Sequence, residues 1–200
     1  CQKAMLVYDQ VLAEKDSLEL RLEMAKNYNN IGIYYFTLGD LNKSLEYHLK
    51  SLEIQKVNFG DRDPDITSNY INIGNLFFYM GDYSNSMKYM KLALDISQDI
   101  FGDLHPITAA AYIGVGNIYY SKGDYSKANI CYHNAHRITK ATMGNHHPDV
   151  ANSLNNIGYL HYLQGEYHDA LESHQAALAI RRDIYGDNHT SVAQSLDNVG

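Results

Sequence analysis

The chain has 200 residues and a formal net charge of −7 at pH 7, and its acidic and basic residues are mixed along the sequence. A face that binds nucleic-acid phosphates needs clustered lysine and arginine, so no nucleic-acid partner is expected. No apolar run approaches the roughly 18 residues of a membrane-spanning helix, so no membrane partner is expected either. Cys1 and Cys131 form no CxxC pair, which disfavours a redox or zinc motif and favours a reducing, cytoplasmic compartment.

The first 21 residues differ from the rest of the chain. Their segment KAMLVYDQVLAEK aligns with the later DALESHQAALAIR, so that Ala4 falls on Ala170 and Leu12 on Leu178. We interpret residues 1–21 as the second helix of a preceding, divergent repeat unit. Because the chain opens with cysteine rather than methionine, we expect it to be a fragment of a longer array.

From residue 22 onward the sequence repeats with a spacing of 42 residues, which three ladders of glycine make visible. The ladders are Gly32, Gly74, Gly116, Gly158 and Gly200; Gly39, Gly81, Gly123 and Gly165; and Gly60, Gly102, Gly144 and Gly186. Such self-similarity is the signature of a repeat architecture. The predicted units are residues 22–63, 64–105, 106–147 and 148–189, followed by the start of a truncated further unit at residues 190–200.

Each unit is predicted to contain two helices, as its third copy illustrates. Pro106 suits the first position of a helix, and apolar residues then recur at intervals of three and four. The pair Gly123-Asp124 favours a turn, a second helical pattern begins at Tyr125, and Gly144 ends it. No segment alternates with period two for long enough to form a strand, so the predicted fold class is all-α.

The unit resembles the tetratricopeptide repeat, whose residues at several positions it shares. With Thr67, Ala109 and Ala151 as position 1, the matches are a small residue at position 8 (Gly74, Gly116, Gly158), an aromatic at position 11 (Phe77, Tyr119), Ala or Ser at position 20 (Ser86, Ala128, Ala170) and Ala at position 27 (Ala93, Ala135, Ala177). His161 departs from the aromatic at position 11. The resemblance implies a right-handed α-solenoid of antiparallel helix pairs.

The eight residues beyond the family's usual 34 carry the loop segments IFGDLHP, TMGNHHP and IYGDNHT. Together with NNIG and GDY, they make the unit similar to those of kinesin light chain and nephrocystin-3 type arrays. This resemblance covers about residues 22–200. It indicates the fold and its subclass and leaves the partner open.

In this family, the first helix of each unit lines a concave groove. Asparagine recurs at the groove-facing positions although it is a poor helix former, and its amide can hydrogen-bond a peptide backbone. The predicted peptide-binding residues are Asn29, Asn30, Asn72, Asn75, Asn117, Asn155, Asn156, Asn198, Tyr159, Phe78, Tyr120 and Tyr162, with Phe36 as a further aromatic of the same row. In the alternative interpretation, these asparagines bond neighbouring helices within the scaffold.

The groove positions also predict the chemistry of the ligand. Family members that bind paired carboxylates use lysine and arginine at positions 2, 5 and 6, where this chain offers only Lys26. A carboxylate clamp without cations has little to offset desolvation. We therefore expect a neutral or mixed peptide with apolar anchors.

No catalytic, cofactor-binding or metal site is predicted. His105, His147 and His189 share one loop position with Asp63, which indicates a helix-start residue. His48 and His174 share position 24 with Met90 and Tyr132 and are interpreted as packing residues, whereas His133, His136 and His168 are expected on the surface. The GVG at residues 114–116 lies in a helical pattern and lacks the preceding strand of a dinucleotide fold.

The sequence thus predicts a non-catalytic scaffold or adaptor that binds a partner segment in its groove. Two alternatives remain: an architectural spacer in a large cytoskeletal or ciliary assembly, and the sensor half of a regulatory protein whose effector domain lies outside this sequence. The oligomeric state, the partner and the pathway stay open.

Overall fold

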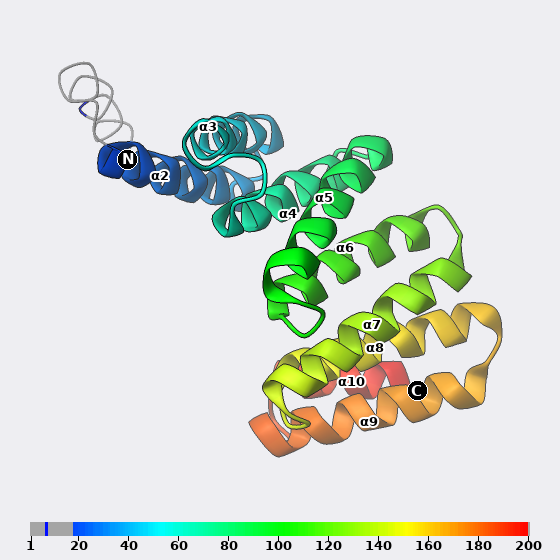
Figure 1. Ribbon diagram of the computed structural model, residues 1–200. Coiled ribbons are helices and arrows are strands. Elements are labelled where there is room, and N and C mark those ends of the chain that lie inside the picture. Colours follow the sequence, from blue (N-terminus) through cyan, green and yellow to red (C-terminus); the bar gives the residue numbers. More distant parts are fainter. Residues whose placement is uncertain (1–6, 8–17, 200) are drawn as a thin grey trace. The chain divides into compact units, whose positions relative to one another are not determined.

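The computed structural model describes residue 7 and residues 18–199 (Figure 1). Within those residues every regular element is a helix, which confirms the all-α class. The helices are α2 (Leu18–Thr37), α3 (Leu41–Phe59), α4 (Pro64–Tyr79), α5 (Tyr83–Phe101), α6 (Pro106–Ser121), α7 (Tyr125–Met143), α8 (Pro148–Gln164), α9 (Tyr167–Tyr185) and α10 (Thr190–Val199).

The described helices form two compact bodies, which are divided between Ile100 and Phe101. The N-terminal body contains α2–α5, and the C-terminal body contains α6–α10. In each body a tight turn joins two antiparallel helices of a unit, and the second helix packs on the first helix of the next unit, as α3 does on α4 and α7 on α8.

The start of α2 differs from the predicted boundary of the first unit. α2 has 20 residues, against 16 for α4 and α6, because it begins at Leu18 rather than near residue 22. Leu18–Arg21 thus continue a first helix, since no glycine separates them from it. The rest of the predicted preceding helix, apart from residue 7, lies outside the described residues.

The tight turns are built from a glycine and the acidic residue that follows it. Gly123 has a φ of 76°, in the left-handed region that side chains other than glycine disfavour. Asp124 then caps α7, because its carboxylate accepts a hydrogen bond from the Lys127 amide at 3.2 Å. Asp40 caps α3 in the same way.

The longer loops between units end in a second kind of cap. The side chains of Asp63, His105, His147 and His189 accept hydrogen bonds from the backbone amide two residues on, at 2.9–3.2 Å. Proline follows the first three at the start of the helix. The predicted helix-start role of these histidines is therefore confirmed.

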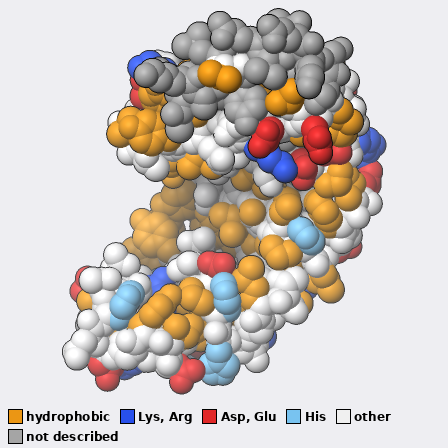
Figure 2. Space-filling model, turned by 90° about the vertical axis from the view of Figure 1, so that its left-hand side faces the viewer, with side chains coloured by type: hydrophobic (Ala, Val, Ile, Leu, Met, Phe, Trp, Pro, Cys, Tyr) orange, Lys and Arg blue, Asp and Glu red, His pale blue; other side chains and the backbone are white. Residues whose placement is uncertain are grey.

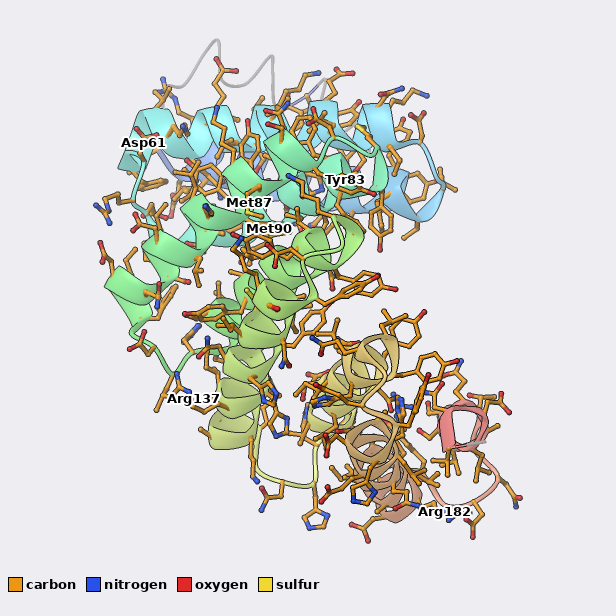
Figure 3. All side chains as sticks on the ribbon, turned by 90° about the vertical axis from the view of Figure 1, so that its right-hand side faces the viewer. Asp61, Tyr83, Met87, Met90, Arg137 and Arg182 are labelled. Carbon is orange, nitrogen blue, oxygen red and sulfur yellow. The ribbon has the colours of Figure 1, made fainter. Side chains whose placement is uncertain are left out.

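The small residue at position 8 lies under the side chain at position 24 of the same unit. A β-carbon added to Gly32 would lie 2.7 Å from the His48 ring, and one added to Gly74 would lie 3.0 Å from Met90 on α5 (Figure 3). Gly158 has the same relation to His174. The predicted packing role of both histidines is confirmed.

Candidate functional site

Two hollows lie on the N-terminal body beside the first helices of its units. One has a volume of about 380 Å³ and is lined by Ala25, Lys26, Asn29, Asn30, Gln55, Asp65, Ser68 and Asn69. The other has a volume of about 350 Å³ and is lined by Ile33, Phe36, Ser44, His48, Asn72, Asn75, Leu76 and Tyr79. Four of the predicted groove asparagines therefore line surface hollows.

The amide of Asn72 also has a structural partner. Its Nδ2 donates a hydrogen bond to Oδ1 of Asn29 at 3.3 Å, which joins α4 to α2. This hydrogen bond between neighbouring helices agrees with the scaffold interpretation. Both side chains are nevertheless only half-buried. Phe78, in turn, packs its ring against Tyr79 and Tyr83 at centroid distances of 5.8 and 5.6 Å.

The C-terminal body carries a continuous row of five tyrosine rings. Successive centroids are 5.9 Å apart from Tyr125 to Tyr120, 5.9 Å from Tyr120 to Tyr159, 6.4 Å from Tyr159 to Tyr162 and 5.7 Å from Tyr162 to Tyr167. We call these five residues the tyrosine row. Tyr159, Tyr162 and Tyr167 are 48, 55 and 65% exposed, so the row offers aromatic surface to solvent. It contains three predicted groove residues.

The hydroxyl groups of the row interact as well as its rings. A hydrogen bond with Tyr159, together with burial, raises the pKa of Tyr120 to about 12. The Tyr120 phenol therefore stays neutral at physiological pH and presents a hydroxyl group that can donate or accept hydrogen bonds.

Of the four predicted groove asparagines in the C-terminal body, Asn117 and Asn155 make hydrogen bonds within the scaffold. Asn117 accepts a hydrogen bond from the Tyr132 hydroxyl at 2.7 Å, so it joins the two helices of its own unit. Asn155 lies between Arg181 and His174; with its amide oxygen toward Arg181, it accepts from both guanidinium nitrogens at 2.8 and 3.0 Å and donates to His174 Nδ1 at 3.2 Å. Asn156 is half-buried on α8, and Asn198 is exposed on α10.

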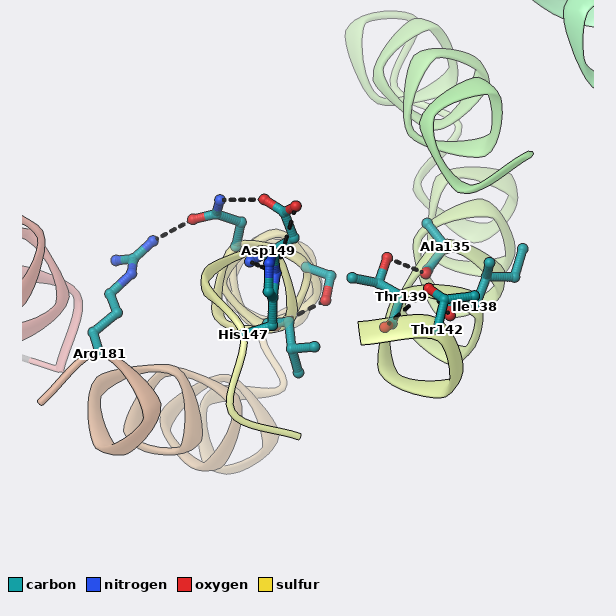
Figure 4. A network of polar contacts seen from close by, with 10 residues as sticks. Ala135, Ile138, Thr139, Thr142, His147, Asp149 and Arg181 are labelled. Atoms are coloured by element: carbon teal, nitrogen blue, oxygen red, sulfur yellow. Dashed lines mark hydrogen bonds and ion pairs between the residues drawn. The ribbon is translucent and has the colours of Figure 1, made fainter. Parts of the chain in front are cut away.

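Arg181 is a buried cation that the sequence analysis did not identify. Its guanidinium donates to Asn152 Oδ1 at 2.8 Å, to Ser195 Oγ at 2.6 Å and to the Ser191 carbonyl at 3.3 Å. Asn152 donates in turn to Asp149 at 3.4 Å, so one amide links the guanidinium to a carboxylate (Figure 4). Burial lowers the pKa of Arg181.

Arg181 does not make the groove a carboxylate clamp. Although it reaches residues at positions 2 and 5 of the fourth unit, its side chain is buried. The four hydrogens on its two terminal nitrogens already have acceptors on α8 and α10. Its role is to bond α9 to both neighbouring helices.

A polar seam between consecutive units also escaped the sequence analysis. Asn69 is buried and donates to the His48 carbonyl and to Gln55 Oε1, both at 3.1 Å. His136, expected on the surface, is half-buried, and its Nδ1 lies 2.8 Å from Ser153 Oγ. The expectation for His136 was wrong because α8 covers it. The sequence feature that could have indicated these contacts is a polar residue at position 3 of the following unit, Asn69 or Ser153.

The remaining surface carries mixed charge. On the face shown in Figure 2, hydrophobic side chains reach the surface in patches, and lysine and arginine are scattered among them. None of the helices in the described part of the chain has the length and apolarity that crossing a membrane requires.

Comparison with protein families gives one match along most of the chain. The sequence model of the tetratricopeptide repeat matches residues 23–99, 65–141, 130–183 and 149–200. None of the curated proteins matches the chain.

Solved structures share the fold at low sequence identity. BtubC (BKLC) from P. vanneervenii superposes with a TM-score of 0.79 and 22% identity, over 92% of this chain and 74% of that one. A Podosopora anserina protein described as a kinesin light chain with nearly identical TPR-like repeats superposes with a TM-score of 0.76 and 15% identity, over 90% of this chain and 84% of its own. Both likenesses concern the fold.

Proposed function

The chain belongs to the tetratricopeptide repeat family, and on that premise we propose that it is a non-catalytic scaffold that binds an extended segment of a partner protein. Domains of this family are generally protein-interaction scaffolds. The observation that carries the proposal is the tyrosine row on the C-terminal body.

Exposed aromatic rings in a row are unusual on a surface that only faces water. Large apolar patches on soluble proteins mark interaction sites, and tyrosine is enriched in the cores of protein interfaces. A tyrosine loses little conformational entropy on binding because it has only two side-chain torsions. Tyr159 and Tyr162 are therefore well suited to hold a ligand.

The spacing of the rings favours an extended ligand. Successive centroids in the row lie 5.7–6.4 Å apart. Alternate residues of an extended β-strand point to the same side and are separated by about 6–7 Å, since each residue advances the strand by about 3.2–3.4 Å. A strand laid along the row would place every second side chain on a tyrosine, and the hydroxyl groups would meet its backbone.

The charge of the site favours a neutral or mixed segment. Arg181 is occupied within the scaffold, and Lys26, the one cation at groove positions 2, 5 and 6 of the sequence, belongs to the other body. Without a free cation at these groove positions, an acidic ligand would lose hydration there and gain no ion pair in return.

The test is selection from a random peptide display library, followed by affinity measurement. We expect the chain to enrich peptides that carry aromatic or other apolar residues at alternate positions. The double variant Tyr159→Ala/Tyr162→Ala should weaken their binding at least tenfold. The control is Ile130→Ala, which removes an exposed apolar side chain from α7 outside the row.

Two results would reject the proposal. One is the absence of any enriched peptide, which would favour the architectural role. The other is equal binding by the double variant and the control, which would place the ligand elsewhere. Circular dichroism must show equal helicity for all three proteins.

A further inference from the structure

The turn between α8 and α9 brings together three side chains that can ligate metals. His161 lies in the last turn of α8, Glu166 precedes α9, and Asp169 lies in its first turn. One ligand atom from each lies within 4.8 Å of the other two, and Nδ1 of His161 is 2.6 Å from Oε2 of Glu166. The imidazole is 17% exposed and the Glu166 side chain 48%, so the cluster is accessible from solvent.

The other repeat units show what this turn ordinarily contains. The same three places hold an aromatic residue, an aspartate and a lysine or asparagine: Tyr35, Asp40 and Lys43; Phe77, Asp82 and Asn85; Tyr119, Asp124 and Lys127. In the third unit Asp124 caps the helix, and Lys127 both pairs with Asp124 at 2.6 Å and lies 5.3 Å from the centre of the Tyr119 ring. Lys43 lies over the Tyr35 ring in the same way, at 5.1 Å. The first and third units thus have a cap, an ion pair and a cation–π contact, whereas in the second unit Asn85 hydrogen-bonds the capping Asp82.

The fourth unit replaces all three residues. The aromatic becomes His161, the capping aspartate becomes Glu166, and the lysine becomes Asp169. Glu166 makes no capping hydrogen bond, because its carboxylate points to His161 instead. Losing such a cap costs about 1 kcal/mol. Three simultaneous departures at one turn therefore remove stabilising contacts and install metal-binding groups.

The charges of the cluster call for a cation. Among the described residues, no lysine or arginine nitrogen lies within 4.0 Å of the Glu166 or Asp169 carboxylate. The N-terminus of α9 favours Asp169 by its dipole, but that effect is worth only about 0.3–1 kcal/mol on an exposed surface. His161 then faces two carboxylates where the third unit balances one carboxylate with one lysine.

We propose that His161, Glu166 and Asp169 bind a divalent transition-metal ion of the Zn²⁺ type. Zinc takes histidine nitrogen and carboxylate oxygen ligands at about 2.0–2.2 Å, and three protein ligands leave a fourth place for water. Ligand atoms around a tetrahedral ion lie about 3.3–3.6 Å apart at those distances, so the cluster needs only side-chain rotations. The ion would take the place of the hydrogen bond between His161 Nδ1 and the Glu166 carboxylate.

The ligand set selects the class of ion. An imidazole suits zinc, copper, nickel and iron, whereas calcium and magnesium prefer oxygen ligands alone. A bound ion would fasten the end of α8 to the start of α9, beside Tyr162 and Tyr167 of the tyrosine row. The ion would stabilise this turn in place of the helix cap and ion pair that stabilise the same turn in the third unit.

The test is calorimetric titration of the chain with ZnCl₂, in a His146→Gln/His147→Asp background that removes the adjacent histidine pair at the other end of α8. We expect one Zn²⁺ per cluster and a Tm that rises with Zn²⁺. The triple variant His161→Tyr/Glu166→Asp/Asp169→Lys restores the residues of the third unit and should weaken Zn²⁺ binding at least tenfold and abolish the rise in Tm. Glu166→Gln/Asp169→Asn, which keeps the shapes, should do the same.

The converse variant Tyr119→His/Asp124→Glu/Lys127→Asp should add a second Zn²⁺ site at the third unit. MgCl₂ titration should give no rise in Tm with any of these proteins. Zn²⁺ affinity that is equal in the background protein and in both loss variants would overturn the proposal, as would the absence of Zn²⁺ binding to the background protein.

Discussion

A β-carbon on Gly116 would lie 2.6 Å from Cε1 of Tyr132, closer than any real contact of that kind. The ring of Tyr132 is held on two sides, because its hydroxyl donates to Asn117 and the residue packs in the core with Ile157 and Leu160. The side chain at position 24 therefore requires glycine at position 8. The larger and more rigid that side chain is, the more a substitution of the glycine should cost.

This relationship predicts different costs for one substitution in two units. Gly116→Ala should lower the free energy of unfolding by about 1–2 kcal/mol, because overpacking outweighs the roughly 1 kcal/mol gain in helix propensity. Gly74→Ala should cost less, since its neighbour is the flexible Met90 side chain, whose Cε and Cγ atoms lie 3.0 Å away and can shift. Urea unfolding followed by circular dichroism measures both.

A double variant provides the control for this prediction. Tyr132→Met gives the third unit the residue that the second carries, and Gly116→Ala should then cost less than in the parent chain. Equal costs of the two glycine substitutions, with no relief in the double variant, would show that crowding is not the cause.

The capping histidines lead to a second prediction. His147→Ala should lower the free energy of unfolding by about 1 kcal/mol, because the Asp149 amide loses its acceptor. His147→Asp should preserve stability, since Asp63 caps α4 at the same place. Thermal unfolding compares the three proteins, and the prediction fails if the aspartate variant is as unstable as the alanine variant.

Buried histidines make the stability depend on pH. Burial lowers the pKa values of His48, His136 and His174, with a hydrogen bond to Asn69 partly opposing this at His48. In the unfolded chain these groups have a pKa of about 6.5, so the unfolded state binds more protons below that pH. Stability should be full above about pH 6.5 and fall as the pH drops towards the lowered native values.

The double variant His48→Met/His174→Met isolates this effect. Methionine already fills position 24 in the second unit as Met90, so the fold should accept it. Urea unfolding at pH 7.5 and pH 5.5 should show a smaller loss of stability on acidification than in the parent chain. An unchanged pH dependence would assign the effect to other groups.

Most of the helices and turns could be predicted from short sequence patterns. The glycine ladders, Gly123-Asp124 and the proline after each capping residue act within a few residues, so the helices and turns followed from them. The contacts of Arg181 were out of reach because its partners lie 14 and 29 residues away. The cluster of His161, Glu166 and Asp169 matches no linear motif, and only the folded turn brings it together.

The groove asparagines show a different limit of the sequence. An asparagine that binds a peptide and one that bonds neighbouring helices would stand at the same positions of the repeat, so the sequence alone does not distinguish them. The structure gives Asn29, Asn72, Asn117 and Asn155 internal hydrogen bonds, so peptide binding by them stays a prediction. The tyrosine row, in contrast, extends beyond the predicted aromatic position to Tyr125 and Tyr167, which begin the second helices.

The network around Arg181 predicts that one side chain holds α10 in place. Arg181→Leu would leave Ser195 Oγ and the Ser191 carbonyl without their donor, at a cost of about 2 kcal/mol. The matched control is Arg182→Leu, one residue on: Arg182 is exposed, and its ion pair with Asp187 at 2.9 Å is worth less than about 1 kcal/mol. In hydrogen exchange, the amides of α10 should exchange faster in the first variant and stay as in the parent in the second, while α6 should be unaffected in both. The prediction fails if the amides of α10 exchange equally slowly in both variants. In that case the desolvation of the buried guanidinium offsets its hydrogen bonds, and apolar contacts such as those of the buried Val192 hold α10.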